Sequence, residues 1–192
     1  IDARWVAADA SEPQQIQHVV DETLQRLGPI DILVNNAGAT WGAPAEDYPL
    51  PAWDKVMNLN VRGYFLLSQA IAKKSMIPRK SGRIINLASI AGLGGNPPQM
   101  TTIAYNTSKG AVINFTKALA AEWGKYNINV NAICPGPTRT DLIESVIKAR
   151  AEATGVGFET MAQEYVRATA MKRMVEPGEV ADLVLFLASP AS

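Results

Sequence analysis

The sequence predicts an α/β protein built on a doubly wound parallel sheet. Short apolar runs typical of strands alternate with amphipathic stretches at helical spacing, the pattern of a parallel sheet covered by helices on both faces. Polar or glycine-containing segments follow these runs directly, and open parallel sheets bind ligands at that edge. The 192 residues contain no internal repeat and predict a single domain, residues 1–192.

The first part of the chain predicts a strand, a helix and a second strand. Residues 4–8 are the first apolar run. The helix that follows has Ser11 as its candidate N-cap and Pro13 in its first turn, and it ends at Gly28-Pro29. Residues 30–34 are aliphatic except for Asp31, which predicts a buried parallel strand.

The middle of the chain predicts the longest helices. Pro51 opens a helical region, with room for one break, that reaches about residue 77. Residues 83–87 form the next strand-like run, and the glycines and prolines of residues 90–102 predict a loop. We expect a long helix over residues 103–125.

The last part predicts one more strand and then mainly helices. Residues 129–133 are strand-like, and Pro135-Gly136 break the chain sharply after them. Residues 138–175 predict one or two helices outside the central layers. The final amphipathic helix is marked by Val180, Leu183, Val184 and Leu187.

Composition excludes several classes of function. Lys plus Arg equals Asp plus Glu, at 18 each, which gives no basic excess for nucleic acid or an anionic membrane surface. No apolar run reaches the roughly 20 residues that span a bilayer. One cysteine, Cys134, and one histidine, His18, make a transition-metal site improbable, so no metal is predicted. The single cysteine also favours an intracellular, cytoplasmic setting.

Polar groups fall at four predicted strand ends. Asp9 follows the first strand, Asn35-Asn36-Ala37-Gly38 the second, Ser89 the third and Pro135-Gly136 the fourth. Because such ends meet at one edge of a parallel sheet, these groups converge there. The Asn35–Gly38 segment alone could equally be a simple turn, since Asn and Gly tolerate left-handed backbone.

Tyr105 and Lys109 are four positions apart in a predicted helix, so both side chains lie on one face. A phenol with a pKa near ~10 is a poor base at neutral pH, and a nearby ammonium lowers that pKa. The pair can thus act as a proton donor and acceptor. The same spacing is also common on solvated helix faces.

Five ordered motifs together make the pattern specific. They are Asn35-Asn36-Ala37-Gly38, Asn60 in Asn58-Leu59-Asn60-Val61, Ser89 in Asn86-Leu87-Ala88-Ser89-Ile90-Ala91-Gly92, Tyr105-Asn106-Thr107-Ser108-Lys109, and Asn129-Val130-Asn131-Ala132-Ile133-Cys134-Pro135-Gly136. In this order they closely resemble the motifs of the short-chain dehydrogenase/reductase family. The segment from Arg173 to Ser189 resembles that family's last helix. The resemblance covers nearly the whole chain and implies a Rossmann-type fold.

The resemblance implies a role for each matching residue. Tyr105 would be the general acid or base, Lys109 would lower its pKa and hydrogen-bond the nicotinamide ribose, and Ser89 would polarise the substrate oxygen. Asn60 would lie in a helix irregularity and position water for a proton relay. The residues implied to contact NAD(P), besides Tyr105 and Lys109, are Asp9, Asn36, Ala37, Gly38, Pro135, Gly136, Thr138 and Thr140.

The chain departs from the family pattern at its ends. No Gly-rich, pyrophosphate-binding turn precedes Asp9, and the first two strands and the final strand of the family are missing. We therefore expect a fragment of a protein of roughly 250 residues, with unpaired sheet edges beside residues 4–8 and 30–34. Ser89 and Tyr105 are 16 positions apart, with extra residues at 94–100 that border the substrate cleft.

The predicted function is interconversion of a ketone and a secondary alcohol with NAD(P), with a weak preference for NADP(H). A 3-oxoacyl thioester and a sugar or polyol are both open as substrates, and residues 138–175 are the candidate lid. The alternative is a non-catalytic fragment or a partner-binding relative of the same fold.

Other residues are assigned more ordinary positions. His18 is expected to be solvated and Cys134 to belong to the core, whereas Trp41 and Trp53 could face the cleft or simply pack. A helix face of mostly small residues predicts a homo-oligomer, although packing within one chain fits it equally well. This face consists of Ala104, Ser108, Ala111, Phe115 and Ala118.

Overall fold

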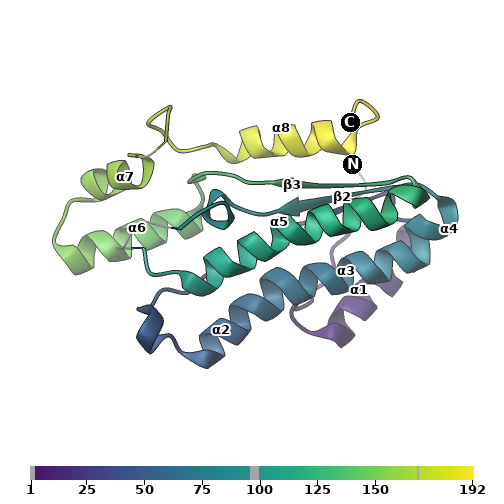
Figure 1. The fold of residues 1–192 in the computed structure, drawn as a ribbon, viewed down its shortest axis with the longest axis horizontal. Helices are drawn as coiled ribbons and strands as arrows, with labels where there is room; N and C mark the ends of the chain where they lie inside the picture. The colour runs from purple at the N-terminus through teal and green to yellow at the C-terminus, as the bar shows by residue number, and fades with distance from the viewer. Residues whose placement is uncertain (1–2, 96–99, 168) are drawn as a thin grey trace. The chain divides into compact units, whose positions relative to one another are not determined.

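Three parallel strands form the sheet in the described part of the chain. In the computed structural model, which describes residues 3–95, 100–167 and 169–192, the order is β1 (Ile32–Asn35), β2 (Gly82–Leu87) and β3 (Ile128–Ile133) (Figure 1). The register pairs Asn35 with Asn86 across β1 and β2, and Leu87 with Ile133 across β2 and β3. The three strands predicted from residue 30 onward are therefore confirmed, with boundaries shifted by one or two residues.

The strand predicted at residues 4–8 was wrong, because the segment has no regular secondary structure. A strand exists only through hydrogen bonds to a neighbouring strand, and none of the described residues forms a ladder with this segment. Its side chains are largely exposed, and Trp5 reaches 84% exposure.

The first helix, α1 (Pro13–Leu27), begins one residue later than predicted. Its N-cap is Glu12 rather than Ser11. A carboxylate oxygen of Asp9 instead accepts hydrogen bonds from the Ser11 N–H at 2.8 Å and the Ser11 hydroxyl at 2.7 Å, which builds a turn ahead of the helix. Gly28 ends α1 as predicted, at φ 81°, where a side chain would be strained.

The long helical region after Pro51 contains two irregular turns rather than one break. Helix α2 (Leu50–Met57) leads into a π-helical turn at Asn58–Gly63 and then into α3 (Tyr64–Ile71). A second π-helical turn, Ala72–Met76, precedes the short α4 (Ile77–Arg79). A π-helical turn adds a residue without ending the helix, so the apolar pattern continues through it.

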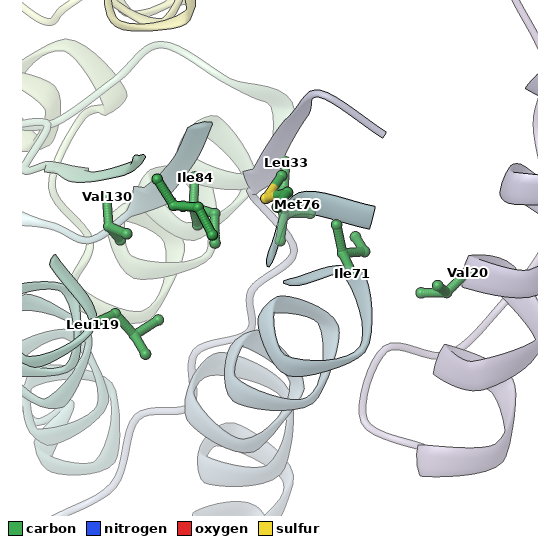
Figure 2. Packing of buried hydrophobic residues seen from close by; sticks show 8 residues of the cluster. Val20, Leu33, Ile71, Met76, Ile84, Leu119 and Val130 are labelled. Atoms are coloured by element: carbon green, nitrogen blue, oxygen red, sulfur yellow. The ribbon is translucent and has the colours of Figure 1, made fainter. Parts of the chain in front are cut away.

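Helices α3 and α5 (Ile103–Trp123) cover one side of the sheet, as Figure 1 shows, and α1 packs against α3. All three helices and all three strands contribute to one apolar cluster (Figure 2). The labelled members are Val20, Leu33, Ile71, Met76, Ile84, Leu119 and Val130. A Cβ added to Gly82 would lie 2.5 Å from Met76 Cγ, so only glycine lets this side chain into the core.

Strand β1 lies at an edge of the described sheet. Leu33 and Asn35 are buried, but Ile32 and Val34 on its other face are 43% and 40% exposed. The expected unpaired edge beside residues 30–34 is thus present. The expectation that this strand is buried throughout was wrong, because alternate side chains point to opposite faces and only one face is covered.

Two compact units divide the chain, Ile1–Cys134 and Pro135–Ser192. The second contains α6 (Asp141–Thr154), α7 (Phe158–Val166) and α8 (Pro177–Ala188), as the sequence predicted. Its own buried cluster consists of Ile147, Ala151, Met161, Val166 and Met174. Among the described residues, no helix combines the length and the apolar character needed to cross a bilayer.

Candidate active site

The polar segments that follow β1 and β2 come together through the sheet register. Asn35 ends β1 and pairs with Asn86, and Leu87 ends β2, so Asn36-Ala37-Gly38 and Ala88-Ser89 leave the sheet at the same edge. Parallel strands send all their carboxyl ends to one edge, which is why two segments 51 residues apart at Asn35 and Asn86 meet here.

Asn60 ties the first of these segments to α5. It is fully buried in the π-helical turn Asn58–Gly63. Its Oδ1 accepts a hydrogen bond from the Ala39 N–H at 2.8 Å, and its Nδ2 donates to the Ala39 carbonyl at 2.9 Å and to the Ser108 hydroxyl at 2.9 Å. The predicted helix irregularity is present, and both amide hydrogens of Asn60 are used by protein groups. Its predicted role in positioning water stays a prediction.

Ser89 and Tyr105 meet at the site. Ser89 caps the short 3-10 turn Ile90–Gly92, where its hydroxyl accepts a hydrogen bond from the Ala91 N–H at 3.1 Å. It also hydrogen-bonds the side chain of Tyr105. The structure therefore brings together two hydroxyl groups that are 16 positions apart in the sequence, a pair that can bind one substrate oxygen.

Gly92 fixes the distance between the two elements that carry these hydroxyls. A Cβ at this position would lie 2.5 Å from the Lys109 backbone carbon and 2.6 Å from the Gly110 nitrogen. The 3-10 turn after Ser89 thus packs on the backbone of α5 with no side chain between them.

Lys109 is buried beside Tyr105, with only 4% of its surface exposed. Its ammonium donates a hydrogen bond to the Leu87 carbonyl at 2.6 Å and lies 5.6 Å from the centroid of the Tyr105 ring. Burial lowers the pKa of Lys109 to about 8, and the charge of Cys134 opposes this shift. Lys109 can therefore gain or lose its charge near neutral pH.

The pKa of Tyr105 departs from the predicted direction. Burial raises the pKa of Tyr105, and the hydrogen bond with Ser89 is the interaction that lowers it. The lowering by Lys109 that the sequence led us to expect stays a prediction. The Lys109 ammonium donates to the Leu87 carbonyl and lies 5.6 Å from the centroid of the Tyr105 ring.

An amide pair beneath the site was missed by the sequence reasoning. Asn35 Nδ2 donates to Asn86 Oδ1 at 2.8 Å and to the Ser68 hydroxyl at 3.1 Å, and Asn86 Nδ2 donates to Thr116 at 2.9 Å. These buried bonds link α3, β1, β2 and α5. Each asparagine lies at or next to the end of an apolar strand run, a position where an amide is unusual, and that was the available signal.

Tyr64, at the start of α3, was also missed. It is 1% exposed, and its hydroxyl donates to the Leu87 carbonyl at 3.3 Å, the same oxygen that Lys109 contacts. No motif spacing marks Tyr64 in the sequence, because its partner is a backbone group.

The remaining predicted cofactor residues make other contacts. Asp9 is exposed and binds Ser11, although the carbonyl of the next residue, Ala10, lies only 2.4 Å from where a Cβ on Gly63 would be. Pro135, Gly136, Thr138 and Thr140 belong to the second unit.

Within that second unit, the two threonines bind neighbouring groups of the chain. The hydroxyl of Thr138 donates to the Gly136 carbonyl at 3.1 Å, and that of Thr140 caps α6 by accepting from the Ile143 N–H at 3.3 Å. Their predicted role at the nicotinamide stays a prediction.

Residues assigned to ordinary positions are found as follows. His18 is exposed and Cys134 is half-buried against the Tyr64–Val112 cluster. Trp41 is 47% exposed, whereas Trp53 packs edge-on against Tyr48. In the small-residue face of α5, Ala104 and Ser108 are buried within the chain, so that part of the face packs internally.

Comparisons with known proteins agree with this geometry. A family model described as enoyl-(acyl carrier protein) reductase matches residues 1–192. The 3-oxoacyl-(acyl-carrier-protein) reductase of Synechocystis sp. is 35% identical over 184 residues, covering 96% of this chain and 67% of that protein.

Solved structures give the same result. NAD+-bound xylitol dehydrogenase has a TM-score of 0.90 and 34% identity, covering 100% of this chain and 75% of that one. A variant of actinorhodin polyketide ketoreductase with NADPH has a TM-score of 0.89 and 33% identity, covering 96% of this chain and 70% of that one. The chain therefore belongs to the short-chain dehydrogenase/reductase family of NAD(P)-dependent oxidoreductases.

Proposed function

We propose that this protein interconverts a ketone and a secondary alcohol, with Tyr105 as the general acid in reduction and the general base in oxidation. The observation that carries the proposal is the hydrogen bond between Ser89 and Tyr105, with the Lys109 ammonium 5.6 Å from the Tyr105 ring centroid. Two hydroxyls that share one hydrogen bond can both turn toward a third oxygen, which is what a substrate carbonyl requires.

Each side chain then has a separate task. Ser89 donates a hydrogen bond to the substrate carbonyl and stabilises the negative charge that develops on its oxygen. Tyr105 gives its phenolic proton to that oxygen, and the nearby Lys109 charge stabilises the phenolate left behind. Asn60 holds Ala39 and Ser108 in place, so the surrounding backbone does not move during the proton transfer. The nicotinamide cofactor, when bound, supplies or accepts the hydride.

The residues present fit such a cofactor. A Cβ on Gly38 would be in van der Waals contact with Asn60 Oδ1 at 3.5 Å and with Lys109 Nζ at 3.8 Å, so the backbone of Gly38 lies directly beside both polar groups. Asn36, Ala37 and Gly38 would line one side of the nicotinamide and its ribose, with Lys109 as the hydrogen-bond donor. The preference for NADP(H) rests on the resemblance to reductases alone, since one similar structure holds NAD+ and another NADPH.

Two substrate classes remain part of the proposal. The relative from Synechocystis sp. is named for a 3-oxoacyl thioester and the first similar structure for xylitol, a polyol. Helices α6 and α7 are the proposed lid, and the proposed setting is a cytoplasmic homo-oligomer.

The test is calorimetric titration with NADPH and NADH of the 192-residue chain and of the protein encoded by the whole gene. We expect at least one of them to bind a cofactor and to reduce acetoacetyl-CoA or a ketose. Tyr105→Phe should abolish reduction and leave cofactor binding intact, while Tyr126→Phe serves as the matched control. If neither protein binds either cofactor, hydride transfer is excluded. Partner binding through the exposed edge and face of β1 then becomes the better account.

A further inference from the structure

Lys109 is held between two tyrosine rings, and the proposed reaction uses only one of them. Its ammonium lies 5.6 Å from the centroid of Tyr105 and 5.7 Å from that of Tyr64. Tyr64 comes from α3, directly after the π-helical turn that carries Asn60, and it is almost completely buried. A cation over a desolvated aromatic face is attracted by it, so Tyr64 has a second interaction with Lys109 besides the shared carbonyl.

The carbonyl of Leu87 joins the two side chains. It accepts the Lys109 ammonium at 2.6 Å and the Tyr64 hydroxyl at 3.3 Å. A carbonyl oxygen has two lone pairs, so both donors can bind at once, but they share its electron density. The ring of Tyr64 therefore favours the charged form of Lys109. The hydroxyl of Tyr64 has the opposite effect, because it competes for the Leu87 carbonyl that stabilises this charge.

Tyr64 itself stays neutral throughout the working pH range. Burial raises the pKa of Tyr64, and a negative charge on Tyr105 raises it further. The titratable groups that act on Lys109 in the described structure are thus Tyr64 and Tyr105, whose rings it contacts, and Cys134, whose charge favours the ammonium. Of the two tyrosines whose rings Lys109 contacts, Tyr64 is the one with no proton-transfer role.

We propose that Tyr64 is a positioning residue: its ring holds the Lys109 ammonium near the Leu87 carbonyl, its hydroxyl competes for that carbonyl, and the two together set how readily Lys109 keeps its charge. The consequence for catalysis rests on the proposed function, because Lys109 acts there on Tyr105. The contact with Lys109 itself does not depend on any bound cofactor.

Removal of the Tyr64 hydroxyl and removal of the Tyr64 ring should shift the pKa of Lys109 in opposite directions. Tyr64→Phe keeps the ring and removes the competing donor, so the Leu87 carbonyl serves Lys109 alone and the pKa of Lys109 rises. Tyr64→Leu removes the ring, and the ammonium loses its attraction, so the pKa of Lys109 falls by about 0.5 to 1. A purely structural role would move both variants in the same direction or neither.

The experiment follows the titration of Lys109 by NMR in protein labelled with 13C at the lysine Cε, without cofactor. The signal is assigned by its loss in Lys109→Arg. Tyr126→Leu is the matched control, because Lys125 lies 5.1 Å from the Tyr126 ring on a different element. In that control the Lys109 midpoint should not move.

A rise in Tyr64→Phe together with a fall in Tyr64→Leu supports the proposal, and the alkaline limb of the kcat/KM profile for ketone reduction should shift in the same two directions. An unchanged midpoint in a folded Tyr64→Leu variant overturns it, as does a shift of the same sign in both. If Tyr64→Leu fails to fold, Tyr64→Phe decides alone, and a fall or no change there overturns the proposal. Opposite shifts in a protein that reduces no ketone support the positioning role and overturn the proposed function instead.

Discussion

The side chain of Asn60 and the backbone of Ala39 form two reciprocal hydrogen bonds, 2.8 and 2.9 Å long. The Asn60 amide therefore pairs with the backbone of Ala39, after β1, much as a neighbouring strand would. Because the amide lies in a π-helical turn, the segment that follows β1 is fixed to a helix instead of to another strand.

Asn60→Asp should destabilise the protein and weaken cofactor binding. A carboxylate can still accept from the Ala39 N–H, but it cannot donate to the Ala39 carbonyl or to Ser108, and it would be a buried charge. We expect a loss of about 2 to 4 kcal/mol in the free energy of unfolding. Denaturant unfolding and NAD(P)H titration measure the two effects. Asn114→Asp, the same change at an exposed position of α5, should change neither.

Ser89→Ala should move the pH dependence of alcohol oxidation upward. The hydrogen bond with Ser89 lowers the pKa of Tyr105, and burial alone raises it. Oxidation needs the deprotonated phenol, which is present above this pKa, so the rising limb should shift to higher pH. The rate should fall by about 10²-fold, as kcat/KM against pH would show. Ser89→Thr keeps the hydroxyl, and an equal shift in that variant would contradict this assignment.

Gly92→Ala should reduce turnover much more than it reduces cofactor affinity. The added Cβ would lie 2.5 Å from the Lys109 backbone, so the turn carrying Ser89 must move away from Tyr105. A displacement of this kind can cost roughly 10²-fold in kcat. Steady-state kinetics and cofactor titration separate the two quantities. At Gly94, in the same loop, nothing lies within 4 Å of an added Cβ, and Gly94→Ala is expected to behave as the parent protein does.

Lys109→Met should change how stability depends on pH. Burial lowers the pKa of Lys109 to about 8 in the folded chain, below the unfolded value near ~10.4. Between these values the unfolded state binds more protons, so the free energy of unfolding rises with pH by about 3 kcal/mol in total.

Guanidinium unfolding at several pH values across that window measures the slope. The raised pKa values of Tyr64 and Tyr105 act with the opposite sign, but only above pH ~10. Lys109→Met should reduce the pH dependence of the free energy of unfolding. Lys117→Met, at an exposed position of the same helix, should leave this pH dependence unchanged. A parent protein with no slope in this window would show that the buried ammonium keeps its ordinary pKa.

The sequence contained enough to assemble much of the site, for reasons that are local. Tyr105 and Lys109 share a helix face because of helical spacing alone, and Ser89 joins them because it follows a neighbouring strand. What depends on backbone partners could not be foreseen. The pairing of Asn60 with Ala39 and the meeting of Tyr64 with Lys109 at one carbonyl leave no trace in residue spacing.

The misplaced elements have physical reasons of the same kind. Residues 4–8 have strand composition, but a strand also needs a neighbour, which composition does not reveal. The second π-helical turn, Ala72–Met76, was not expected because a single extra residue hardly disturbs an apolar pattern. Gly28 was placed correctly since its positive φ is a local requirement.

The turn at Asn58–Gly63 makes the length of the helical region as important as its residues. Deleting one position there would let the helix close into regular α form and rotate everything beyond it by about 100°. Ser68 would then turn away from Asn35, and Tyr64 from Leu87, although every one of these side chains would still be present. Among natural variants of this sequence, we therefore expect substitutions within Asn58–Gly63 to be tolerated far more often than the deletion or insertion of one residue.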